Sequence, residues 1–279
     1  MLADLIKHIF LSLFKGDQGS QADTSLDSTG TNDSPLEEKK FIQGFQPGKN
    51  EPCFCGSART FSECCGSTEQ NRQPPHGVVV IENALDAESC ISFVEKAKNG
   101  HREWLKIGVV DPETGEMTDQ RDKTRVTQYA ELGESQKQLN SLVQGLWTDT
   151  VAPAFNVQIE FFEYPHILCY SPGGFYGMHA DSDHFHESIG KWERVVDRDI
   201  SMLLYLNSEF EGGALHFVNF NYRYQPRPGD LLLFPSDQRY AHRAEEVTSG
   251  ERYSVVSWAC VVGSERVEDG PSENTVSLV

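Results

Sequence analysis

Short apolar runs separated by turn residues fill the chain after residue 156, and this pattern restricts the fold more than any other feature. We expect strands over residues 157–162, 166–170, 176–181, 200–207, 214–218, 230–234, 240–246 and 253–262. Glycine and proline pairs such as Gly212-Gly213 and Pro228-Gly229 lie between these runs and separate them into individual strands. A series of about eight short strands of this kind predicts a double-sheet jelly roll.

Two helices and one more strand are predicted before these runs. Residues 78–81 are expected to form the strand, and Asp86 is a suitable N-cap for a helix over 87–98. The apolar face of this helix is expected to hold Cys90, Ile91 and Val94. A second helix is expected near 135–148. Helices followed by a run of strands predict an α+β fold, with a jelly-roll core and supporting helices.

The N-terminal part of the chain differs in composition from the domain that follows it. Polar side chains recur at helical spacing within the apolar first fourteen residues, which predicts an amphipathic helix. A docking helix or interfacial anchor is favoured over a signal peptide, because no basic leader or small-residue cleavage site accompanies the segment. Membrane contact is the less favoured of these two roles. We divide the chain into a helix and flexible linker (1–46), a cysteine-rich unit (47–67), a globular domain (76–264) and a loose tail (265–279).

Charge and cysteine content exclude several classes of function. The chain has 24 Lys and Arg residues against 42 Asp and Glu residues, a formal net charge of −18. Such a surface repels phosphate backbones, so we expect no nucleic-acid partner. No apolar run reaches the ~18 residues that a membrane-spanning helix needs. Four of the seven cysteines lie within residues 53–65, which favours metal binding in a reducing compartment and predicts a cytoplasmic protein.

A tripeptide at the end of one predicted strand offers metal ligands. His179 and Asp181 are two residues apart, so on a strand both side chains point to the same face. Two histidines and one carboxylate form the non-haem Fe(II) site, which leaves positions free for substrate and oxygen. The tripeptide alone is a weak signal, and its surroundings must decide. The next polar residues precede a loop up to Asp197 and are expected to be solvated or to face substrate rather than to bind metal: Asp183, His184 and His186.

An ordered set of motifs surrounds this tripeptide. The set comprises Tyr-Ser-Pro-Gly-Gly over 170–174, Arg-Asp-Ile-Ser-Met-Leu-Leu-Tyr-Leu-Asn over 198–207, Glu-Gly-Gly over 211–213, Pro-Gly-Asp-Leu-Leu-Leu-Phe-Pro over 228–235, Ala241-His242 and Gly250-Glu-Arg252. With these motifs the chain resembles the prolyl 4-hydroxylase branch of the Fe(II)/2-oxoglutarate dioxygenases over roughly residues 76–262. The fold of that family is the double-stranded β-helix, a jelly roll, in agreement with the predicted strands.

The resemblance implies a role for individual residues. The iron ligands would be His179, Asp181 and His242. The pocket for 2-oxoglutarate would hold Arg252, Tyr205 and Tyr170. A guanidinium suits the distal carboxylate, because its planar fork binds a carboxylate through two hydrogen bonds and stays charged when buried. Arg198 and Trp258 would face the substrate, with Trp258 on the same inward strand face as Arg252.

The cysteine-rich unit predicts a zinc site. Its four thiols follow the spacing C-x-C, eight residues, C-C, and they are Cys53, Cys55, Cys64 and Cys65. Four thiolates in so short a loop suit tetrahedral Zn²⁺, and a unit of this size needs a metal to fold. The Pro-Cys-x-Cys-Gly-Ser run and the Cys-Cys-Gly ending resemble the SEC-C motif, first known from the SecA translocase ATPase. This resemblance implies a partner related to translation or secretion, although the lysines usual between the cysteine pairs are absent here. A redox-active cysteine cluster is the alternative.

These observations together predict an Fe(II)- and 2-oxoglutarate-dependent dioxygenase. We expect it to hydroxylate prolyl residues of a cytosolic protein and to release succinate and CO₂, with ascorbate as a further cofactor, as is common in relatives. One alternative is a hydroxylase of a non-prolyl residue or a small molecule. Another is a zinc-module adaptor with an inactive jelly roll, which the intact set of ligands opposes.

Overall fold

The computed structural model describes residues 48–279 apart from 54–56, 68–72, 111–116 and 122–123. The predicted N-terminal helix and linker therefore lie outside the described residues. The main feature is a pair of antiparallel sheets. The larger sheet has the order β1 (Val79–Ile81), β16 (Leu231–Pro235), β12 (Ile200–Tyr205), β19 (Arg252–Val261), β8 (His166–Tyr170), β6 (Gln128–Glu131) and β2 (His101–Trp104). At the other end of β19 it continues through β7 (Ile159–Glu163) to β20 (Thr275–Ser277).

The smaller sheet carries much of the candidate site. Its order is β15 (Tyr222–Tyr224), β14 (Leu215–Phe217), β17 (His242–Ala244), β9 (Phe175–His179) and β5 (Arg125–Val126). Three two-stranded ribbons are attached: β3 (Lys106–Val110) with β4 (Met117–Arg121), β10 (Asp183–His186) with β11 (Lys191–Arg194), and β13 (Phe210–Gly212) with β18 (Val247–Gly250). Antiparallel pairing throughout both sheets, together with the facing cores described next, makes this a jelly roll.

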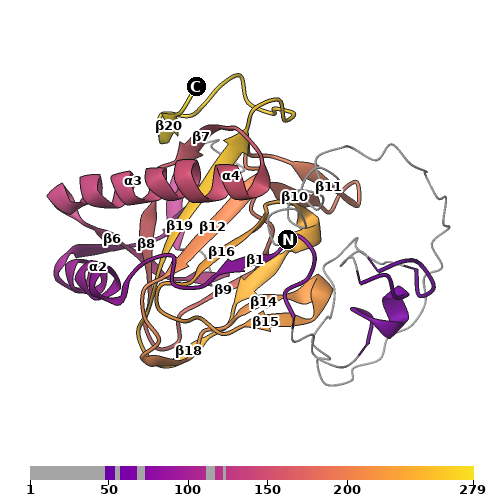
Figure 1. Cartoon of the computed structure of the whole chain (residues 1–279), viewed down its shortest axis with the longest axis horizontal. Coiled ribbons are helices and arrows are strands. Elements are labelled where there is room, and N and C mark those ends of the chain that lie inside the picture. Colours follow the sequence, from indigo (N-terminus) through magenta and orange to yellow (C-terminus); the bar gives the residue numbers. More distant parts are fainter. Residues whose placement is uncertain (1–47, 54–56, 68–72, 111–116, 122–123) are drawn as a thin grey trace.

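The strand β12 shows how one sheet serves two cores. Met202 and Leu204 pack into the cluster beneath the helices, which also holds the fully buried Trp147. Leu203 and Tyr205 point the other way, into the cluster between the two sheets. Alternate residues of a strand face opposite sides, so a strand with apolar residues on both faces is stable when both faces are covered. Figure 1 shows α2 and α3 on one side of the larger sheet and β9, β14 and β15 on the other.

The first helix, α2 (Ala87–Asn99), begins where the sequence predicted. The Asp86 side chain accepts a hydrogen bond from Ser89 N at 2.8 Å, which confirms the N-cap. The predicted apolar face was wrong in one residue, since Ile91 is 64% exposed. The buried residues follow the helical repeat i, i+3, i+4 and i+7, and Ile91 lies one step outside it: they are Cys90, Phe93, Val94 and Ala97.

The second helical segment is longer than expected. After a short 3₁₀ turn (Gly133–Ser135), α3 (Gln136–Gly145) continues through a π-helical stretch (Leu146–Val151) into α4 (Ala152–Phe155). It ends at Asn156, which adopts a left-handed conformation with φ 53°. Further 3₁₀ turns occur at Phe61–Glu63, Val218–Phe220 and Gln238–Tyr240. No helix among the described residues combines the length and apolar content needed to cross a lipid bilayer.

Each of the predicted strands has a counterpart, with ends shifted by a few residues, but other strands were not foreseen. The strands β2 to β6 lie in a region where charged residues obscure any alternation. The residues after His186, expected as a loop up to Asp197, include β11, which pairs with β10 in a hairpin. In place of a wholly loose tail over 265–279, the structure has β20 paired with β7. Such short edge strands depend on a neighbouring strand, which a local pattern does not reveal.

Candidate functional site

Two strands of the smaller sheet bring two histidines together. His179 ends β9 and His242 begins β17, and their Cα atoms are partners in the antiparallel ladder. Asp181 follows just after β9, with its Oδ1 3.5 Å from His179 Nε2 and its Oδ2 3.9 Å from His242 Nε2. One nitrogen or oxygen of each residue lies within 4.8 Å of the other two. This spacing allows a single metal ion to contact all three side chains.

Asp181 lies in a bend rather than on the predicted strand over 176–181. The strand ends at His179, and the backbone N–H groups of Asp181 and Ser182 both donate to Ser236 O, at 3.0 and 2.9 Å. Ser201 Oγ donates to Asp181 Oδ2 at 2.6 Å, and Ser236 Oγ lies 2.8 Å from Ser201 Oγ. The bend and the serine pair aim the carboxylate at the histidines, so strand alternation alone was the wrong reason for expecting it there.

Backbone carbonyls fix the tautomer of both histidines. His179 Nδ1 lies 2.9 Å from Gly177 O, and His242 Nδ1 lies 3.0 Å from Tyr240 O. A carbonyl oxygen accepts only, so Nδ1 carries the proton in each ring and Nε2 of the neutral ring presents a lone pair. Burial, followed by the neighbouring His179, lowers the pKa of His242 to about 4. His242 is therefore neutral near pH 7, as a metal ligand must be.

Asp181 supplies the negative charge of the cluster. Burial alone would raise the pKa of its carboxyl group, but His242, His179 and Arg198 outweigh burial and hold that pKa below its usual range. Two neutral imidazoles and one carboxylate are the donor set typical of non-haem Fe(II). The residues present therefore fit that ion.

A cavity of about 310 Å³ opens beside this cluster and contains a buried arginine. Arg252 is 1% exposed, and its Nη1 donates to Gly213 O at 3.1 Å. Its guanidinium carbon lies 4.8 Å from the ring centroid of Tyr170 and 5.3 Å from that of Tyr205. Arg252 Nε and the Tyr205 hydroxyl are both buried without a hydrogen-bond partner. Unsatisfied buried donors are costly, and a carboxylate placed here would accept from both groups.

A second arginine in the cavity wall is already neutralised. Arg198 makes a two-pronged ion pair with Glu163, and its Nη1 donates to Asp181 O at 3.1 Å. Its guanidinium carbon lies 3.9 Å from the ring centroid of Trp258. Arg198 and Trp258 therefore form one stacked unit at the cavity, next to the backbone of Asp181.

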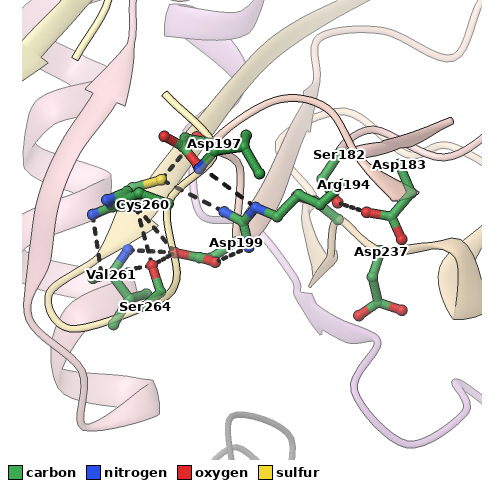
Figure 2. Close-up of polar contacts among 12 residues, drawn as sticks. Ser182, Asp183, Arg194, Asp197, Asp199, Asp237, Cys260, Val261 and Ser264 are labelled. Carbon is green, nitrogen blue, oxygen red and sulfur yellow. Dashed lines mark hydrogen bonds and ion pairs between the residues drawn. The ribbon is translucent and has the colours of Figure 1, made fainter. Parts of the chain in front are cut away.

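The loop that carries Arg198 is held from both sides by buried aspartates. The Asp199 carboxylate lies between Arg194, Val261 N and Ser264 Oγ, at 2.9, 2.8 and 2.6 Å (Figure 2). The Asp197 carboxylate accepts from Val267 N and Glu268 N, and its carbonyl accepts from Cys260 Sγ. These bonds attach the loop to the end of β19 and to the segment that follows it.

Sequence reasoning did not identify several side chains at the cavity. Tyr176 stacks on His179 with ring centroids 3.6 Å apart, and Arg125 lies beyond it, 4.8 Å from the Tyr176 ring centroid. Glu163 and Ser201 act through Arg198 and Asp181, as described above. Tyr176 could have been found from the motif itself, because it lies three residues before His179. Arg125 and Glu163 come from distant strands, so no local pattern connects them with the site.

Other histidines near the site take no part in the donor cluster. His184 is exposed, and His186 Nε2 lies 3.2 Å from Glu193 Oε2 on the facing strand. Neither belongs to a group of candidate metal ligands among the described residues.

Three of the four cysteines predicted to bind zinc lie together. Cys53, Cys64 and Cys65 are buried, and their sulfur atoms lie within 4.8 Å of one another, a spacing that suits a metal ion. Ser57 Oγ and Arg59 Nη2 donate to Cys64 Sγ at 3.0 and 3.1 Å. Cys55, the fourth predicted ligand, lies outside the described residues.

Comparison with known proteins agrees with these two sites. Residues 165–260 match the model of the 2OG-Fe(II) oxygenase superfamily, and residues 50–67 match the SEC-C motif. A protein of Acanthamoeba polyphaga mimivirus that is named, by inference, as a prolyl 4-hydroxylase is 30% identical over 129 residues, covering 43% of this chain and 53% of that protein. A PKHD-type hydroxylase of Sphingopyxis alaskensis is 31% identical over 98 residues, covering 34% of this chain and 42% of that protein.

A solved structure resembles the chain as well. It is the viral collagen prolyl hydroxylase of Paramecium bursaria Chlorella virus-1 in complex with 2-oxoglutarate. The two chains are 19% identical and superpose with a TM-score of 0.48, and the match covers 66% of this chain and 95% of the viral chain. The chain spans about half the length of the curated relatives described above. It contains a 2OG-Fe(II) oxygenase domain similar to prolyl 4-hydroxylases, together with a SEC-C motif, which confirms both resemblances predicted from the sequence. The oxygenase family implies Fe(II) and 2-oxoglutarate as cofactors.

Proposed function

We propose that the chain is an Fe(II)- and 2-oxoglutarate-dependent dioxygenase that hydroxylates prolyl residues of a cytosolic protein, with release of succinate and CO₂. One observation carries this proposal. A single cavity is lined both by the three candidate metal ligands and by Arg252, a buried arginine that has no carboxylate partner among the described residues. The donor set suits Fe(II), and the arginine suits a dicarboxylic cosubstrate that reaches the metal with its other end.

In this proposal His179, Asp181 and His242 hold the iron. When bound, the iron and 2-oxoglutarate together would activate O₂, of which one atom would enter the substrate and the other would enter succinate. The chain's own contribution is orientation. Ser201 fixes one carboxylate oxygen of Asp181, and the stacked Tyr176 ring restricts rotation of His179. Such supporting contacts typically change metal affinity or activity by ~10–100-fold.

Arg252 would hold the distal carboxylate of 2-oxoglutarate, with the Tyr205 hydroxyl as a second donor. Tyr170 closes the same pocket, since the Arg252 guanidinium lies over its ring. Burial raises the pKa of Tyr205 to about 12, so its hydroxyl is protonated near pH 7 and able to donate. The low exposure of this end of the cavity excludes water, which strengthens a charge-assisted hydrogen bond.

The substrate would enter beside Arg198 and Trp258. The ion pair with Glu163 and the stacking on Trp258 hold the Arg198 side chain in one place, so its remaining surface is prepared to contact a peptide carbonyl. The names of the similar proteins, which are hydroxylases of the prolyl and PKHD types, support a prolyl residue as the target. Ascorbate would keep the iron in its ferrous form.

The cysteine unit, residues 47–67, would be a zinc module separate from the oxygenase domain, residues 76–264. Cys53, Cys55, Cys64 and Cys65 would bind Zn²⁺, and the donors to Cys64 would stabilise its thiolate. Three of these cysteines and Phe61 belong to the same buried cluster as the residues between the two sheets. The module would therefore bring its partner, a protein related to translation or secretion, close to the iron.

The experiment uses the full chain loaded with Fe(II) without oxygen and then mixed with 2-oxoglutarate, ascorbate, air and extract of host cells that lack the protein. We expect succinate and one added oxygen on a prolyl residue, measured by mass spectrometry. His179→Ala should abolish both products, whereas His184→Ala, an exposed histidine outside the donor set, should retain them. Succinate without any prolyl oxidation would refute the prolyl substrate, and no succinate from the wild type would refute the enzyme assignment.

A further inference from the structure

Carboxylates accompany most arginines of this acidic chain. Among the arginines whose side chains the structure describes, all but three form an ion pair with Asp or Glu. The three that do not are Arg59, Arg125 and Arg252. With 42 acidic residues against 24 basic ones, an arginine without a carboxylate partner stands out as a site where another anion can bind.

Two of these three arginines already have a role. Arg59 donates to Cys64 Sγ in the cysteine cluster, where a metal-bound thiolate would be negative. Arg252 faces the end of the cavity proposed for the distal carboxylate of 2-oxoglutarate. The other carboxylate of 2-oxoglutarate would bind the metal, so the cosubstrate leaves no anion for Arg125.

Arg125 lies in the wall of the same cavity. It is on β5, directly opposite Tyr176 of β9, and its guanidinium carbon lies 4.8 Å from the centroid of the Tyr176 ring that stacks on His179. Gly177 allows the two strands to approach: its N–H donates to Thr124 O at 2.6 Å, and a Cβ at this position would lie 3.0 Å from that oxygen. Arg125 is therefore separated from a candidate metal ligand by a single aromatic ring.

Arg125 interacts with the Tyr176 side chain, but one of its donors lacks a protein acceptor. Its Nε is buried without a hydrogen-bond partner, although the rest of the side chain is only partly buried. Burying a cationic donor without an acceptor is unfavourable, and a carboxylate is the acceptor that best matches a guanidinium. Arg198, on the same cavity, shows the contrast, because Glu163 already occupies both of its prongs.

We propose that Arg125 binds a carboxylate of the substrate, so that the enzyme selects a prolyl residue with an acidic residue close to it in the peptide. This inference rests on the proposed function and specifies its substrate class. A chain with a net charge of −18 repels acidic peptides at long range, so selection of one requires a local cation inside the cavity.

The test uses two matched series of peptides, each peptide with one proline at position 0. In the first series a single Glu occupies one of the positions from −3 to +3, and in the second series Gln occupies the same position. Binding is measured by fluorescence anisotropy to the full chain loaded with Mn²⁺ and 2-oxoglutarate, and hydroxylation is measured with Fe(II) by mass spectrometry. We expect one Glu position to lower the Kd by about tenfold or more relative to Gln, because the hydrogen bond is charge-assisted. Arg125→Gln should remove this difference, and Arg125→Glu should reverse it in favour of Gln at the same position.

Two controls separate this proposal from general effects. Lys137→Gln removes one positive charge from the exposed face of α3 and should leave the Glu preference unchanged. The KM for 2-oxoglutarate in peptide-free turnover should be the same in Arg125→Gln and the wild type. Equal affinity of the wild type for the two series, binding of neither series, or a Glu preference that persists in Arg125→Glu would overturn the proposal. Absence of succinate with the Glu preference intact would instead overturn the proposed function alone.

Discussion

Replacement of Arg252 by Met should separate cosubstrate binding from stability. The side chain is 1% exposed and has no carboxylate partner within the described part of the chain, so its ion pair with 2-oxoglutarate would form away from water. Loss of one partner of a buried, hydrogen-bonded charge pair costs ~2–5 kcal/mol, or about 30-fold to 4,000-fold in affinity at about 1.4 kcal/mol per factor of ten. An exposed ion pair would contribute only ~0–1 kcal/mol. We therefore expect at least a 30-fold increase in the KM for 2-oxoglutarate.

The stability of the same variant provides the second half of the prediction. Without 2-oxoglutarate the Arg252 side chain is a buried cation with one hydrogen bond, to Gly213 O. Removing it loses that bond but also removes the cost of an unpaired charge, so the free energy of unfolding should change by less than about 1 kcal/mol. A purely structural arginine would behave in the opposite way, with a large loss of stability and no specific effect on the cosubstrate.

The assay measures succinate over a range of 2-oxoglutarate concentrations at constant Fe(II), and urea unfolding of the protein without cosubstrate. Arg227→Met is the matched control, because Arg227 is largely exposed and lies outside the cavity. Arg252→Lys, which keeps the charge but loses the planar fork, should fall between the wild type and Arg252→Met. An unchanged KM for 2-oxoglutarate in Arg252→Met would refute the reasoning and point to Arg125 as the group that holds the cosubstrate.

Four further predictions concern the metal, its support, the cysteine unit and the fold. Asp181→Ala should lose iron and turnover together, measured by elemental analysis and succinate release, whereas Asp181→Glu should bind iron with little turnover. Ser201→Ala should weaken iron binding by about 10–100-fold in a chelator competition, and unchanged affinity would refute its orienting role. A chain that begins at residue 75 should lose zinc yet still convert 2-oxoglutarate, and loss of that activity would make the cysteine unit structural. The hydrogen bond from Arg102 lowers the pKa of Glu251 to about 2. The ionised Glu251 therefore stabilises the fold above about pH 4.5, and this stabilisation is lost as the pH falls from about 4.5 to about 2. In Arg102→Met, the free energy of unfolding should depend less on pH in this range.

The sequence was sufficient for features that depend on local chemistry. The N-cap at Asp86 is a contact between residues three apart, and the strand runs of the larger sheet are apolar on both faces, so both are visible in a short window. The cysteine motif and the pair His179 and Asp181 are local in the same sense, and the structure does bring that pair together, whereas His242 was assigned through the family resemblance. The role of each site residue remains a prediction.

Contacts between distant segments could not be predicted in the same way. Glu163 and Arg198 are 35 residues apart, and their ion pair exists because β7 and the loop before β12 both approach the end of β19. The bend after His179 depends on Ser236, which belongs to another part of the chain. The hairpin β10–β11 and the strand β20 are polar, so their sequences do not distinguish them from loops.

The aspartates on either side of Arg198 have a consequence for how substrate preference can evolve. The two carboxylates bind the last residue of β19, Val261, and the segment after it, through Ser264 and the backbone of residues 267 and 268. A substitution or an insertion in that segment would shift the Arg198 loop, whereas His179 and His242 lie on strands of the other sheet. On the proposed function, variation in this segment would alter which peptide is accepted while leaving both histidines of the donor set in place. Divergence of this tail among related chains would then record changes of substrate.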